Sequence, residues 1–269
     1  MNPLIASALT ELTDRDLAIM DDVEQFRLLT TKQLQQLHFP VGPGGHSSQA
    51  ASTKAAMRAL ERLERNRILS RLSRRIGGVR HGSSGYIWQL TSYGDRLQRA
   101  RRGETGRRRY IEPGGMFVEH TLAVTDATVT LRKLAREGRL EVLQVDGEPA
   151  SHRQFTGPHG VPQTLKPDLY AVTATGAYED SHFIEIDRDT EHIPAILRKC
   201  RLYAAYAATG TEQHRRGVFP AVLWVVPTPE RAKRIADAIR DDRGLPDALF
   251  QVITTDQLAS HLTAAEDSP

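Results

Sequence analysis

Apolar residues recur three and four positions apart in the first third of the chain, which is the spacing of a buried helix face. This pattern gives way to strict alternation of apolar and polar residues, which is typical of strands, on either side of a glycine-rich tip. A short helix is expected after the second strand. The expected helices are 14–29, 32–38, one capped by Ser52 or Thr53, and one reaching about Arg99, with strands at 68–75 and 86–90.

Three helices followed by a two-stranded hairpin is the element order of a winged helix-turn-helix. The segment Leu90-Thr-Ser-Tyr-Gly94, directly after the second strand, resembles the same position in many such modules. In that architecture the third helix enters the major groove of DNA, and the hairpin tip lies against the backbone or the minor groove. We therefore predict a winged helix-turn-helix domain of the α+β class over residues 1–100.

Charge is unevenly distributed. Residues 1–110 contain 19 Lys and Arg against 10 Asp and Glu, whereas the remainder contains 17 against 23. A basic part joined to an acidic part indicates that the first binds a polyanion, here double-stranded DNA. The alternative is a winged helix used for protein contacts, with solvated arginines. The candidate DNA-binding residues are Lys54, Arg58, Arg62 and Arg65 on the third helix, and Arg71, Arg74, Arg75 and Arg80 on the hairpin.

A change of pattern marks a second domain. Residues 101–115 form a basic linker that ends in Pro113-Gly-Gly115, and a long helix follows over 117–137. The rest alternates strands and helices, which predicts an α/β domain with a central mixed sheet over residues 116–269. Residues 147–163 are expected to be irregular. The expected strands are 140–145, 165–170, 182–187, 221–226 and 250–254, with helices from Asp189 or Thr190 to about Ala208, over 229–241 and over 255–262.

Two of these strands carry acidic residues. Because side chains alternate along a strand, Glu185 and Asp187 share a face of the second acidic strand. If that strand pairs with the first, Asp168 can converge with them. Three carboxylates so close together would repel one another unless a divalent cation lay between them.

The order of elements, with Pro167-Asp168 on one strand and Glu185-Ile186-Asp187 on the next, resembles the PD-(D/E)XK nuclease superfamily. That resemblance implies a restriction-endonuclease-like fold and phosphodiester hydrolysis assisted by Mg²⁺ (or Mn²⁺). It implies that Asp168, Glu185 and the carbonyl of Ile186 are metal ligands, with Glu119 as an additional acidic ligand.

The sequence departs from the superfamily pattern at one catalytic position. A lysine usually stands where this chain has Asp187, and in some members it has moved to the following helix. Lys199 is then the candidate catalytic lysine, and Lys166 a weaker substitute. The alternative is structural: Asp187 caps the next helix, and Lys199 is a solvated helix residue.

The whole chain is similar to the replication-relaxation family of plasmid and mobile-element proteins. The similarity covers about residues 14–255 and is carried by the winged-helix start and three segments: Glu119-His-Thr-Leu-Ala-Val124, Phe183-Ile-Glu-Ile-Asp-Arg-Asp-Thr-Glu191, and Lys199-x-x-x-Tyr203. The family is associated with plasmid replication and DNA relaxation, which implies nicking.

The expected function is therefore a DNA-binding protein with a Mg²⁺-dependent endonuclease or nickase domain. One alternative is a non-catalytic DNA-binding replication accessory or transcriptional regulator with a degenerate nuclease fold, and another is a protein-interaction scaffold. Partners expected besides DNA are a second copy of the chain or plasmid replication and transfer proteins.

Composition excludes several other classes. No apolar run approaches the roughly 20 residues of a membrane span, and the first residues show no secretion signal. The single cysteine, Cys200, excludes an internal disulfide framework and a cysteine-rich zinc site. The expected location is the cytoplasm.

Overall fold

The computed structural model describes residues 3–72, 85–104, 115–157 and 160–264. The chain forms two compact units, Met1–Val129 and Thr130–Pro269, which meet within helix α6 (Gly115–Arg136). The sequence places the domain change earlier, at a linker over 101–115. Most of that linker, 105–114, lies outside the described residues.

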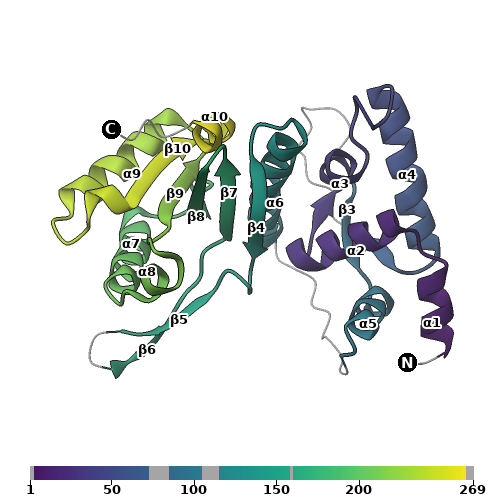
Figure 1. Cartoon of the computed structure of the whole chain (residues 1–269), viewed down its shortest axis with the longest axis horizontal. Coiled ribbons are helices and arrows are strands. Elements are labelled where there is room, and N and C mark those ends of the chain that lie inside the picture. The colour runs from purple at the N-terminus through teal and green to yellow at the C-terminus, as the bar shows by residue number, and fades with distance from the viewer. Residues whose placement is uncertain (1–2, 73–84, 105–114, 158–159, 265–269) are drawn as a thin grey trace. The chain divides into compact units, whose positions relative to one another are not determined.

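The first unit combines helices with a small sheet (Figure 1). The strands of this sheet pair antiparallel in the order β1-β3-β2. Strands β2 and β3 lie within the predicted strands 68–75 and 86–90, of which residues 73–75 lie outside the described residues, and a two-residue strand between α2 and α3 is added. The elements are α1 (Pro3–Thr10), α2 (Asp14–Phe26), β1 (Leu29–Thr30), α3 (Thr31–His38), α4 (Gln49–Arg65), β2 (Leu69–Arg71), β3 (Ile87–Leu90), α5 (Ser92–Arg101) and the first part of α6.

Side-chain caps decide where these helices begin. Thr13 and Thr30 each start a helix with a capping box, in which the side chain three residues later bonds back to the cap. The expected cap of the longest helix is wrong, because Ser48, rather than Ser52 or Thr53, caps α4. Ser52 is buried inside the helix, where its hydroxyl receives a hydrogen bond from Gln35.

The first part of α6 packs within the N-terminal unit. The side-chain amide of Gln33 on α3 donates to the carbonyl of Leu122 and to Asp126, both at 2.8 Å. Val118 and Leu122 are buried in one apolar cluster with Leu28, Leu72 and Ile87, which lie in or beside the small sheet. The long helix that the sequence assigns to the second domain therefore begins as part of the first unit.

The second unit is built on a five-stranded mixed sheet in the order β10-β9-β8-β7-β4. The strands β4, β7 and β8 pair antiparallel, whereas β8, β9 and β10 run parallel. The elements are β4 (Glu141–Gly147), β5 (Arg153–Thr156), β6 (Pro162–Leu165), β7 (Leu169–Thr175), β8 (Tyr178–Ile186), α7 (Ile193–Ala207), α8 (Thr211–Arg216), β9 (Ala221–Val226), α9 (Pro229–Asp241), β10 (Phe250–Thr254) and α10 (Leu258–Thr263).

Two features of this unit differ from the sequence-based expectation. The stretch expected to be irregular contains the β5–β6 hairpin, whose strands pair from Arg153↔Leu165 to Thr156↔Pro162. The short helix α8 is also unexpected. In addition, α7 begins after His192, which makes no side-chain cap, so neither Asp189 nor Thr190 caps it.

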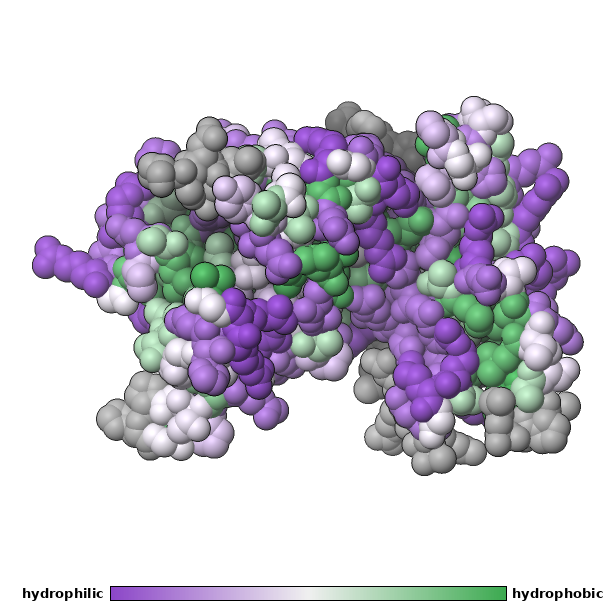
Figure 2. Space-filling model, in the orientation of Figure 1, coloured by the Kyte–Doolittle hydropathy of each residue, from purple (hydrophilic) through white to green (hydrophobic). Residues whose placement is uncertain are grey.

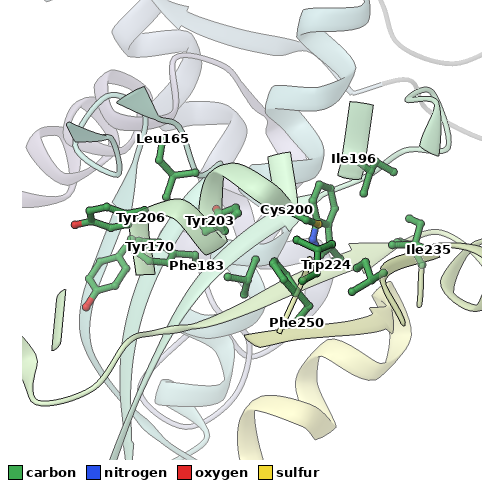
Figure 3. Packing of buried hydrophobic residues seen from close by; sticks show 14 of the residues in the cluster. Leu165, Tyr170, Phe183, Ile196, Cys200, Tyr203, Tyr206, Trp224, Ile235 and Phe250 are labelled. Atoms are coloured by element: carbon green, nitrogen blue, oxygen red, sulfur yellow. The ribbon is translucent and has the colours of Figure 1, made fainter. Parts of the chain in front are cut away.

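One apolar cluster joins α7 and α9 to the same face of the sheet. Phe183 and Trp224 on the strands meet Cys200 and Tyr203 on α7 and Ile235 on α9, as Figure 3 shows. The rings of Phe183 and Tyr203 lie 5.6 Å apart, which is a favourable aromatic separation. This packing holds α7 over the middle of the sheet and so positions the polar residues beside the cluster.

The surface is mainly hydrophilic, as expected for a chain in which 26% of the residues are charged. Hydrophilic residues cover most of the face drawn in Figure 2, with small apolar areas between them. In the described part of the chain, no helix is both long and apolar enough to cross a membrane.

Candidate functional site

The pairing of β7 with β8 brings two of the predicted acidic residues together. Leu169 lies opposite Ile184, so Asp168, one residue earlier, lies beside Glu185 at the end of the hairpin. The backbone N–H of Ile186 donates to Asp168 Oδ2 at 2.8 Å. The alternation of side chains along the two strands therefore correctly places Asp168 and Glu185 on one face.

Glu185 is buried, with 1% of its surface exposed, and α7 supplies a partner for each of its oxygens. The ammonium of Lys199 contacts Oε2, and the hydroxyl of Tyr203 donates to Oε1 at 2.5 Å. These two residues are four positions apart, which places them on the same side of a helix, one turn from each other. We call Asp168, Glu185, Lys199 and Tyr203 the carboxylate–lysine cluster.

Burial dominates the electrostatics of this cluster. It raises the pKa of Glu185, and the neighbouring Asp168 adds to that rise, whereas the ammonium of Lys199 and the hydroxyl of Tyr203 oppose it and favour the ionised carboxylate. Burial lowers the pKa of Lys199, but the negative charges of Glu185 and Asp168 raise it by a larger amount. The net shift of the Lys199 pKa is therefore upward. Lys199 therefore stays protonated and is the cation of the cluster.

The third predicted carboxylate does not join this cluster. Asp187 accepts hydrogen bonds from the guanidinium of Arg231, at 2.7 and 3.1 Å, and the side chains are 1% and 3% exposed. Arg231 stands in the first turn of α9 and also donates to the carbonyl of Glu191. Asp187 is therefore a buried ion-pair partner that ties the end of β8 to α9.

A divalent cation does not fit the cluster in this arrangement. Two carboxylates are a suitable donor set for Mg²⁺, but Lys199 and Tyr203 occupy both oxygens of Glu185. Among the described residues there is no group of three or more His, Cys, Asp or Glu side chains that could hold a metal. Glu119 is exposed on the part of α6 that belongs to the first unit, whereas Asp168 and Glu185 belong to the second.

The predicted DNA-binding residues separate into two groups. Lys54, Arg58 and Arg65 are exposed on α4, opposite the face that Ala56, Leu60 and Leu63 bury. None of these three has an ion pair or hydrogen bond within the described part of the chain. They are available to a ligand.

The other candidates have different surroundings. Arg62 binds the buried Asp16 at 2.6 Å and so joins α4 to α2. Arg71 pairs with Glu64, and its guanidinium lies over the rings of Tyr86 and Trp88. The remaining hairpin candidates, Arg74, Arg75 and Arg80, lie outside the described residues.

Comparison with known proteins identifies the family of the chain. The replication-relaxation family model matches residues 20–222, most of the chain. The chain belongs to the replication-relaxation family. Membership suggests a role in plasmid replication. No curated protein and no solved structure matches the chain.

Within this replication-relaxation protein, two site residues have roles that the sequence pattern does not reveal. Tyr203 lies in the apolar core, but its hydroxyl donates to Glu185. Its position four residues after Lys199 places it one helical turn away, which is the sequence feature that connects the two. The sequence does not indicate the role of Arg231, because Arg231 lies 44 residues beyond Asp187 and no spacing rule connects them.

We predict that Lys199→Met destabilises the protein by about 3 kcal/mol or more, because it leaves Glu185 buried without a cation. Adding Glu185→Gln should recover most of that loss, since the neutral amide needs no counter-charge. Chemical denaturation of the single and double variants measures both values. If Lys199→Met unfolds at the wild-type denaturant concentration, the ion pair does not stabilise the fold.

Proposed function

We propose that this replication-relaxation protein binds duplex DNA through α4 and serves plasmid replication without cutting DNA itself. The observation that carries the proposal is the exposed basic face of α4, where Lys54, Arg58 and Arg65 have no acidic partner among the described residues. Unpaired basic side chains that gather on one face of a helix are typical of a surface that binds a polyanion.

The topology of the first unit supports this assignment. Helix α2, strand β1, helices α3 and α4, and strands β2 and β3 follow one another in the order of a winged helix-turn-helix. In that fold α4 is the helix that enters the major groove. Its inner face is anchored by apolar residues and by the Arg62–Asp16 pair, so the outer face is presented on a rigid support.

In the second unit, the arrangement of the strands favours a nuclease-like fold, whereas the contacts of the acidic side chains do not favour nuclease activity. The strands β4, β7 and β8 pair antiparallel, and β9 and β10 continue the sheet in parallel after α7, an arrangement that resembles the core of the PD-(D/E)XK superfamily. In contrast, Lys199 occupies the space on Glu185 that a metal would need, and Asp187 is bound to Arg231. A fold can persist as a scaffold after its chemistry is lost.

Binding is tested with the double variant Arg58→Ala/Arg65→Ala. We expect weaker binding to all duplex sequences, and a slope of log affinity against log salt that is shallower by about 2, because two phosphate contacts are lost. Fluorescence anisotropy at several salt concentrations gives both quantities.

The matched control is Arg96→Ala, which removes an exposed arginine from α5 of the same unit. It should leave affinity and salt slope near the wild-type values. Equal effects of the control and of the α4 variant would mean that binding follows net charge and not this helix face.

Cutting is tested separately with supercoiled plasmid. We expect the wild-type protein with Mg²⁺ or Mn²⁺ to produce no more open circles than the Asp168→Ala or Glu185→Ala variants. If the wild type nicks the plasmid and both variants do not, the cluster is catalytic, and the endonuclease that the sequence resemblance implies is the function.

A further inference from the structure

A single acidic residue interrupts the basic face of α4. Glu61 is exposed and lies at helical spacing with Lys54, Arg58 and Arg65, each three or four residues from the next. Successive positions of this kind follow one line along a helix. Glu61 therefore stands in the middle of the surface that is proposed to face DNA, with cations before and after it.

Other carboxylates of the same unit form ion pairs that join its elements, whereas Glu61 does not. Glu64 pairs with Arg71 at 2.8 Å, and Asp16 pairs with Arg62 at 2.6 Å. Glu61 has no hydrogen bond or ion pair in the described part of the chain, although arginines lie three residues before it and four after it. Its carboxylate is directed to solvent and is available to a ligand.

A carboxylate on a DNA-facing helix has restricted chemistry. It repels phosphate oxygens, so it weakens binding that depends on the backbone alone. As an acceptor without a proton to donate, it can bond only to base edges that donate. In the major groove those are the exocyclic amino groups, and the favoured partner of Glu is N4 of cytosine.

We propose that Glu61 is a specificity-determining residue, which accepts a hydrogen bond from the amino group of a cytosine in the major groove. The flanking cations hold the phosphates on either side. This inference rests on the proposed DNA binding by α4 and adds the base that the helix reads. Loss of the carboxylate should relax the choice of base at one position while strengthening non-specific binding.

The experiment selects duplexes from a randomised library with the full-length chain. Wild type should recover a motif that contains one cytosine which Glu61→Ala no longer requires. The variant's affinity for that motif should fall roughly tenfold, since one base contact is lost. Its affinity for unrelated duplex should rise. In Glu61→Gln the preferred base should shift toward adenine, because Gln pairs with the adenine edge.

The matched control is Glu11→Ala, which removes an exposed carboxylate from the turn between α1 and α2. It should keep the wild-type motif. Thermal unfolding of each variant should coincide with the wild type, because all the substituted side chains are exposed.

The experiment distinguishes a failure of the proposed DNA binding from a failure of the proposed role of Glu61. If the wild type binds no duplex at all, the proposed function fails, and the role of Glu61 fails with it. If the wild type binds but Glu61→Ala selects the same bases, or the wild type selects none, only the inference about Glu61 is overturned.

Discussion

A buried carboxylate needs a cation, and in this protein Lys199 supplies it. Glu185 lies on the central strand of the sheet with almost no exposed surface. Transfer of a charge from water to such a place costs several kcal/mol unless a partner compensates it. The ammonium of Lys199 and the hydroxyl of Tyr203 provide that compensation from α7, so the site and the docking of the helix depend on the same contacts.

The same arrangement recurs at other places where distant segments meet. Asp187 binds Arg231 of α9, and Glu212 of α8 accepts hydrogen bonds from Arg153 on the β5–β6 hairpin and from Tyr206. In each case a buried acid joins elements that are far apart in the sequence. These three buried acids, Glu185, Asp187 and Glu212, therefore anchor helices and the hairpin of the second unit. This explains why they do not gather around one point as ligands for a metal would.

Much of the fold follows from local pattern, because helix and strand periods reflect which side of an element is buried. Alternation along β7 and β8 was enough to bring Asp168 and Glu185 to one face. Local pattern could not supply partners: Arg231 for Asp187 and Asp16 for Arg62 come from remote segments. It also missed the β5–β6 hairpin, since the glycines and prolines at 157–162 favour a loop interpretation. The sequence pattern also assigns all of α6 to the second domain, whereas the first part of α6 packs against Gln33 in the first unit, a contact that depends on tertiary packing.

Lys199, rather than a metal ion, is the cation of the carboxylate–lysine cluster in this structure. A crystal structure of the protein grown with a high concentration of Mn²⁺ tests it directly, because anomalous scattering locates the ion without ambiguity. The expected result is no manganese between Asp168 and Glu185, with the ammonium of Lys199 still on Glu185. A manganese peak bridging the two carboxylates, with Lys199 displaced, would contradict the account.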